Sequence, residues 1–185
     1  MLTRHRTVYL ELAARYVVFL ILNLYGWSKM AGGQFFRPGH FPAEVAKIPL
    51  AEASGFQLAW AFFGYSTAYI VFIGLSQVVG AWLLLWEKSK LIGTAVLFPI
   101  LLNIIVVDLA YQVSFGAMTV ASACLALLVL VLFLNQSVLR TVFEIIFQPP
   151  ASKSMTLKER GVALVVALCI MGLMIALLQV FELFQ

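Results

Sequence analysis

The sequence has little charge, little cysteine and little histidine, and each shortage excludes a class of protein. Only 11% of its 185 residues are charged, whereas a soluble domain contains about 25%. Cys124 and Cys169 form no CxxC or Cys–His spacing, so neither a disulfide framework nor a metal site is predicted. His5 and His40 lie outside the long apolar runs, which argues against a haem held between membrane helices. The sequence also has no glycine-rich phosphate loop.

Apolar residues are abundant instead. They make up 63% of the chain, and the mean hydropathy is +1.03. Five runs have about the 20 residues that a helix needs to cross a bilayer. They are Tyr9–Met30, Ser66–Trp86, Leu91–Ala110, Phe115–Asn135 and Gly161–Phe184. Because hydrocarbon leaves no partner for free backbone groups, each run is predicted to be a helix.

The connections between the runs predict how the helices are arranged. The turns Glu87–Lys90 and Tyr111–Ser114 are short, so neighbouring helices must be antiparallel. We therefore predict an all-α membrane protein: an antiparallel four-helix transmembrane bundle plus a fifth, C-terminal transmembrane helix. In this interpretation residues 1–135 form the bundle, with an outward loop at 31–65. Residues 136–160 form a cytoplasmic amphipathic helix and basic linker, and 161–185 form the fifth helix.

Two of these connections contain further predicted structure. Within the outward loop, Ala51–Phe63 is predicted to form a short helix with its aromatic residues on one side. It is either a lid over the mouth of the bundle or a plain interfacial anchor. Gln136–Phe147 is predicted to continue the fourth helix until Pro149 and Pro150 end it.

The distribution of basic residues predicts the orientation. Lys and Arg collect in cytoplasmic loops. One side would carry Arg4, Arg6, Arg15, Lys88, Lys90, Arg140, Lys153, Lys158 and Arg160, and the other Lys29, Arg37 and Lys47. The N-terminus is therefore predicted to be cytoplasmic and the C-terminus outside, in a bacterial-type inner (plasma) membrane. The bilayer also explains the net charge of +4, so no nucleic-acid partner is expected.

Polar side chains inside the first three apolar runs are the candidate site. They are Asn23, Tyr25, Lys29, Gln77, Asn103, Asp108 and Gln112. Such residues usually face the interior of a bundle, and Pro99 is expected to kink the third helix beside them. We expect an outward-opening pocket with Lys29 and Asp108 at its mouth. The alternative is that the amides only tie helices together while Lys29 reaches the headgroups.

Two simpler features are expected to be structural. Glu11 and Arg15 are spaced as an i,i+4 ion pair. Small residues spaced by four, such as Ser76 and Gly80, are expected to let helices approach closely.

Several of these residues together resemble the DoxX-like membrane family. The first run ends Gly26-Trp-Ser-Lys29, followed by Met30 and Gln34-Phe-Phe; the second carries Gly74, Gln77, Gly80 and Leu83-Leu-Leu, and a basic turn, Gly93 and Asn103 follow. The resemblance covers about residues 10–135. It implies a four-helix membrane bundle, and the family includes small subunits of quinone-linked sulfur oxidoreductases and stress-associated redox partners. This chain departs from the family where Gln77 replaces a common carboxylate, and in its fifth helix.

Three functions are compatible with these features. The favoured one is a small membrane subunit of a redox-linked or assembly complex that binds a quinone- or lipid-like ligand in the outward pocket. Its partner would be another protein or a second copy of the chain. The chain encodes no cofactor, and a quinone is the candidate. The alternatives are a quinone-dependent oxidoreductase in its own right and a small-molecule transporter, so the sequence leaves open whether the protein is an enzyme.

Overall fold

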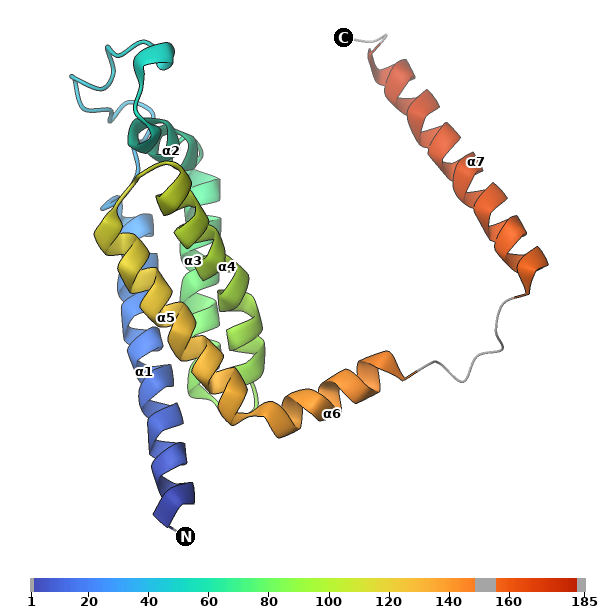
Figure 1. Ribbon diagram of the computed structural model, residues 1–185. Coiled ribbons are helices and arrows are strands. Elements are labelled where there is room, and N and C mark those ends of the chain that lie inside the picture. Colours follow the sequence, from blue (N-terminus) through green and yellow to red (C-terminus); the bar gives the residue numbers. More distant parts are fainter. Residues whose placement is uncertain (1, 149–155, 183–185) are drawn as a thin grey trace. The chain divides into compact units, whose positions relative to one another are not determined.

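The computed structural model describes residues 2–148 and 156–182, and the regular secondary structure within them is all helical (Figure 1). Seven α-helices and one short 3-10 helix (Leu50–Glu52) lie in these residues. The α-helices are α1 (Leu2–Ala31), α2 (Gly55–Gly64), α3 (Thr67–Leu85), α4 (Lys90–Ala110), α5 (Phe115–Leu134), α6 (Gln136–Phe147) and α7 (Leu157–Glu182).

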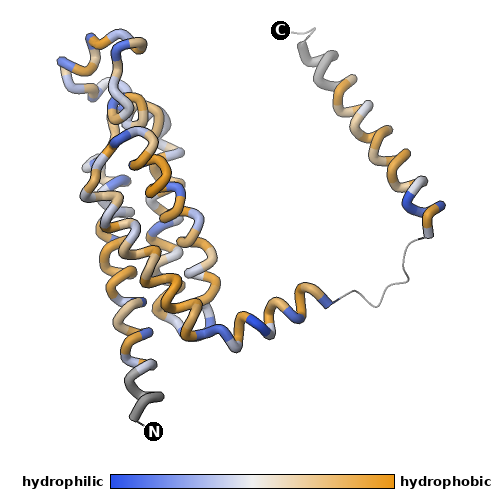
Figure 2. The backbone as a smooth tube through the Cα atoms, in the orientation of Figure 1, coloured by the Kyte–Doolittle hydropathy of each residue, from blue (hydrophilic) through white to orange (hydrophobic). Residues whose placement is uncertain are grey.

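Five of these helices are long and apolar enough to cross a membrane, and they identify the chain as a membrane protein. The spans are Thr7–Ala31, Thr67–Leu85, Lys90–Ala110, Phe115–Leu134 and Leu157–Ala176. Apolar residues dominate each of them (Figure 2). The five apolar runs of the sequence are thus confirmed as helices to within a few residues at each end. Phe184, Lys153 and the two prolines at 149 and 150 lie outside the described residues.

The chain divides into two units, Met1–Thr141 and Val142–Gln185. In the first unit α1 contacts α3 and α5, and α4 also contacts α3 and α5. Each of these four helices therefore contacts two of the other three, and all four contribute to one core. The core residues are Val18, Leu22, Ala81, Leu84, Leu97, Leu101, Ala121, Cys124 and Leu128. In the second unit, the side chains of α7 that the structure describes are all exposed.

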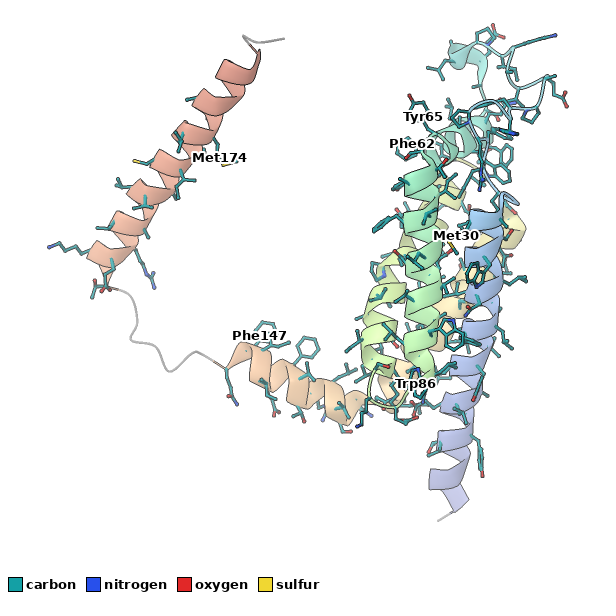
Figure 3. The ribbon with its side chains drawn as sticks, turned by 180° about the vertical axis from the view of Figure 1, so that it is seen from behind. Met30, Phe62, Tyr65, Trp86, Phe147 and Met174 are labelled. Carbon is teal, nitrogen blue, oxygen red and sulfur yellow. The ribbon has the colours of Figure 1, made fainter. Side chains whose placement is uncertain are left out.

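Glycine allows α1 and α3 to cross closely. A Cβ added to Gly26 would lie 2.8 Å from the carbonyl oxygen of Gly74, and one added to Gly74 would lie 2.8 Å from Cγ of Met30. Met30 lies between the two helices (Figure 3). Small residues at helix crossings give backbones the close contact that packs helices in lipid.

Aromatic side chains mark both ends of α3. Phe62 and Tyr65 lie at one end and Trp86 at the other (Figure 3), and all three are exposed. Residues 65 and 86 are about 30 Å apart along the helix axis, which matches the thickness of a hydrocarbon core. Tyr and Trp are enriched at the two membrane surfaces. We call these ends the Lys29 end and the Glu87 end, after residues that lie at each.

The short helix in the 31–65 loop begins later than the sequence predicted. The prediction was Ala51–Phe63, whereas α2 is Gly55–Gly64 and a 3-10 turn precedes it. The cause is a capping box. The Ser54 hydroxyl accepts from the backbone N–H of Gln57, and the Gln57 side chain accepts from the backbone N–H of Ser54.

The prediction that residues 136–147 continue the fourth span was wrong in one respect. Asn135 interrupts the helix with φ −108° and ψ 20°, so that α6 is a separate helix. The Asn135 side chain donates to the carbonyl of Val131, 2.8 Å away, and its backbone N–H bonds the last carbonyls of α5. These bonds satisfy groups that the end of a helix leaves unpaired.

Arg15 does more than the predicted pair with Glu11. Only 1% of Arg15 is exposed, and its guanidinium donates to the carbonyls of Leu84 and Leu85 and to the Glu87 carboxylate. Lys90 Nζ lies 2.7 Å from Glu11 and 2.9 Å from Glu87. Arg15 therefore caps α3, because a cation is favourable beside the free carbonyls of a helix C-terminus. Hydrogen bonds from Arg15 and then Lys90 lower the pKa of Glu87 below its usual value.

Candidate ligand-binding cavity

A cavity of about 1000 Å³ lies at the Lys29 end, between α1, α3, α4 and α5 and beside α2. This volume is at the upper end of the range for small-molecule sites. Most of its wall is apolar, and a few polar side chains converge on it. Of the predicted site residues, the cavity is lined by Tyr25, Lys29, Gln77, Asn103 and Asp108.

Lys29 and Asp108 are buried on the wall without forming an ion pair. Their exposed fractions are 7% and 9%. Nζ of Lys29 lies 5.5 Å from the centroid of the Tyr25 ring, a cation–π distance. Neither side chain has a salt bridge within the described part of the chain, and Oδ2 of Asp108 is buried without a hydrogen-bond partner there. The cavity wall therefore carries one basic and one acidic side chain that are not paired with each other.

Gln77 is the most deeply buried polar group in the cavity. It is 1% exposed, and Oε1 has no hydrogen-bond partner within the described residues. A Cβ added to Gly26 would lie 3.5 Å from Cβ of Gln77. Gln77 is thus level with Gly26, which is about 4.5 Å along the helix axis from Lys29. The polar groups follow the length of the cavity, with the charged ones at the Lys29 end.

Aromatic side chains from α2 and the preceding loop cover this end of the cavity. Phe35, Trp60 and Phe63 all line it. The Phe35 ring lies 5.9 Å from Trp60 and 5.5 Å from Phe63, between centroids. Phe35 has φ +68°, a conformation uncommon for a bulky residue outside functional or strained sites. We call α2 with Phe35 the aromatic lid.

The ends of α2 are held by close backbone contacts. A Cβ on Gly55 would lie 2.5 Å from the carbonyl oxygen of Tyr111, in the turn between α4 and α5. A Cβ on Gly64 would collide with the carbonyl oxygen of Phe36. The helix therefore reaches from the 31–54 loop to the α4–α5 turn, across the end of the cavity.

Asn23 and Gln112 lie elsewhere. Asn23 accepts a hydrogen bond of 3.1 Å from Trp82 Nε1 and donates one of 2.9 Å to the carbonyl of Phe19, so it ties α1 to α3. Gln112 follows α4 with φ +51° and lines a smaller hollow beside Asp108. The structure does not place either residue among the lining of the cavity.

Several lining residues were not among the sequence predictions. They include Phe35, Tyr69 and Cys124. Aromatic and aliphatic residues are common in every apolar run, so the sequence gives no signal that separates those on a cavity wall from those that face lipid. Within the part of the chain that the structure describes, no three His, Cys, Asp or Glu side chains gather as a metal site.

Comparisons with known proteins give a relative without a known function. No protein-family model and no solved structure matches this chain. The uncharacterized protein YwoB of Bacillus subtilis (strain 168) is 28% identical over 152 residues, which is 80% of this chain and 91% of YwoB. The similarity therefore extends over nearly all of YwoB.

Proposed function

We propose that this protein is a small integral membrane subunit that binds an amphiphile, quinone- or lipid-like, in the cavity beneath the aromatic lid. The observation that carries the proposal is the set of polar groups that have no partner within the described part of the chain, on an otherwise apolar wall. A buried polar atom without a partner costs about 1–3 kcal/mol. Gln77 Oε1 and Asp108 Oδ2 are two such atoms in one cavity. A bound head group would supply what they lack.

The residues fit the head of a quinone in either redox state. Lys29 would donate a hydrogen bond to a ring carbonyl, and Asp108 would accept one from a ring hydroxyl. Gln77 has an amide, which both donates and accepts. The same three groups would hold a hydroxyl or amine head. A quinone, when bound, would supply two-electron redox chemistry; the chain's own residues would orient its head, and the aliphatic wall would take its tail.

In the membrane, α1, α3, α4 and α5 form the proposed antiparallel four-helix bundle, and α7 forms the fifth crossing. The Lys29 end faces outward, the N-terminus is cytoplasmic and the C-terminus is outside. The excess of Lys and Arg at the Glu87 end supports this orientation. In this proposal the membrane is a bacterial-type inner (plasma) membrane, and the chain is related to the DoxX-like family. The exposed α7 would contact a partner subunit or a second copy.

The test is to purify the protein from its own membranes in a mild detergent and to identify extracted small molecules by mass spectrometry. A lipophilic compound should be recovered near one per chain. The Lys29→Met and Asp108→Asn variants should each lose most of it, and the double variant should lose less than the sum if both contact one head group. Lys47→Met with Glu44→Gln is the matched control, because these residues are exposed in the loop outside the cavity. Equal recovery from all variants would contradict the proposal.

A further inference from the structure

The wall of the cavity between α3 and α4 reaches the outer surface of these helices. Phe72 and Ser76 on α3, and Pro99 and Asn103 on α4, line the cavity. Phe72, Pro99 and Asn103 are also exposed on the surface of the protein, and Ser76 is partly exposed. Residues that line a cavity and also reach the outer surface mark an opening. We call these four residues the side opening.

The side opening lies in the part of the α3–α4 interface, or seam, that is nearer the Lys29 end. Toward the Glu87 end, a Cβ on Gly93 would lie 2.8 Å from the carbonyl oxygen of Gly80. A Cβ on Gly80 would lie 2.6 Å from Cδ2 of Leu97. The two helices are therefore in backbone contact there, and Leu97 is fully buried. Beyond Leu97 the facing side chains line the cavity instead of packing together.

The Asn103 side chain indicates that a polar group binds at this opening. It lies about 10 Å along the axis from the end of α4 at Ala110, within the hydrocarbon region of a spanning helix. Its side chain makes no hydrogen bond to any described residue, whereas the nearby Ser76 hydroxyl donates to the carbonyl of Phe72 at 2.6 Å. An unpaired amide facing lipid tails is costly. A ligand that enters here would supply the partner that no described residue provides.

The aromatic lid covers the route over α2, while Tyr69, Ser114 and Gly116 at the same end line the cavity and are exposed. The aromatic lid lies across the Lys29 end, and the backbone contacts at Gly55 and Gly64 hold it there. A ligand coming from water over α2 would have to displace Trp60 and Phe63, whose rings contact Phe35. A ligand already dissolved in the bilayer would meet no such cover between Phe72 and Asn103.

We infer that the cavity is filled from the bilayer, through the side opening between α3 and α4, by a membrane-dissolved amphiphile with a hydroxyl- or amine-bearing head. The head passes Asn103 and pairs with Lys29, Asp108 and Gln77, and the tail remains in the opening. This inference rests on the proposed function, since it names the route and the class of ligand for the same cavity.

The test uses a long-chain alcohol that carries a photoreactive diazirine in mid-chain. The full-length protein is reconstituted in phosphatidylcholine vesicles that already contain the probe, and light is applied after increasing times. Adducts on Leu101, which lines the cavity and is 1% exposed, report occupancy. In the seam variant, Ser76→Phe with Asn103→Phe, this labelling should be at least tenfold slower. The matched control is Leu75→Phe with Leu102→Phe, because both leucines are exposed at the same depth but do not line the cavity.

The outcomes separate the inference from the proposed function. Slow labelling in the seam variant, with normal labelling in the control and in Trp60→Ala, supports the side opening. Equal labelling of Leu101 in the wild type and the seam variant overturns the side opening and leaves ligand binding standing. Labelling of Leu101 that is faster when the probe is delivered through water on cyclodextrin than when it is already in the vesicles also overturns the side opening, because the lid is then the route. A wild type whose Leu101 is never labelled by either delivery overturns both.

Discussion

Replacing Gln77 by leucine should have opposite effects on the empty and the occupied protein. The amide is 1% exposed and its oxygen has no partner within the described residues. An unsatisfied buried polar atom costs about 1–3 kcal/mol, and leucine removes that cost while keeping a similar volume. The ligand-free Gln77→Leu variant should therefore be more stable than the wild type by about 1–3 kcal/mol. The amphiphile should bind it about fivefold more weakly, because one lost hydrogen bond is worth about 1 kcal/mol.

The assay is reversible unfolding in lipid bicelles by sodium dodecyl sulfate, before and after delipidation, with and without added extract of the bound compound. Gln136→Leu is the control, since this amide is exposed at the start of α6 and lies outside the cavity lining. This control should leave both the free energy of unfolding and the affinity for the amphiphile unchanged. A ligand-free Gln77→Leu variant that is less stable than the wild type would refute the reasoning. It would show that Gln77 holds helices together through hydrogen bonds of its own.

Three further predictions concern the Glu87 end and the helix crossing. Arg15→Met should lower the free energy of unfolding by about 1.5–3 kcal/mol, because hydrogen bonds to a charged group are lost from the end of α3; the exposed Arg140→Met is its control, and equal losses in the two variants would contradict the capping role. The lowered pKa of Glu87 means that its carboxylate contributes stability at pH values above the usual carboxyl pKa of about 4.3 and loses it as the pH falls through the lowered value. Between pH 6 and pH 3, the free energy of unfolding should therefore fall less in Glu87→Gln than in the wild type. An equal fall in the two proteins would count against the ion pairs of Glu87 with Arg15 and Lys90. Gly26→Leu should destabilise the protein by at least about 1–3 kcal/mol through overpacking against Gly74 and Val78; Gly172→Leu, where an added Cβ meets nothing within 4 Å, should be neutral, and a tolerated Gly26→Leu would mean that α1 and α3 are not in close contact.

The sequence predicted the helices well because one physical requirement dominates them. A stretch such as Leu91–Ala110 must satisfy its backbone internally in lipid, so length and hydropathy suffice to find it. The exact ends depend on local hydrogen bonds. Ser54 and Gln57 delayed the start of α2, and Asn135 separated α6 from α5. Both are side chain–backbone contacts that apolar periodicity does not report.

The candidate site was harder to predict, because the position of a polar residue on its helix decides its role. Asn23 and Gln77 look alike in the sequence. The structure bonds Asn23 to Trp82 and Phe19, while Oε1 of Gln77 lies on the cavity wall with no partner among the described residues. Which of them faces the cavity follows from the α1–α3 crossing at Gly26 and Gly74, a contact between residues far apart in the chain. Arg15 is similar: its pairing with Glu11 is local, whereas its bonds to Leu84 and Leu85 are not.

The most direct test of ligand binding is an experimental structure of the protein extracted from its own membranes into lipid nanodiscs, at a resolution that shows bound lipids. We predict elongated density beneath the aromatic lid, with its head within hydrogen-bonding distance of Lys29, Asp108 and Gln77. Lys29 paired directly with Asp108 in a collapsed cavity, with no density between them, would contradict ligand binding there.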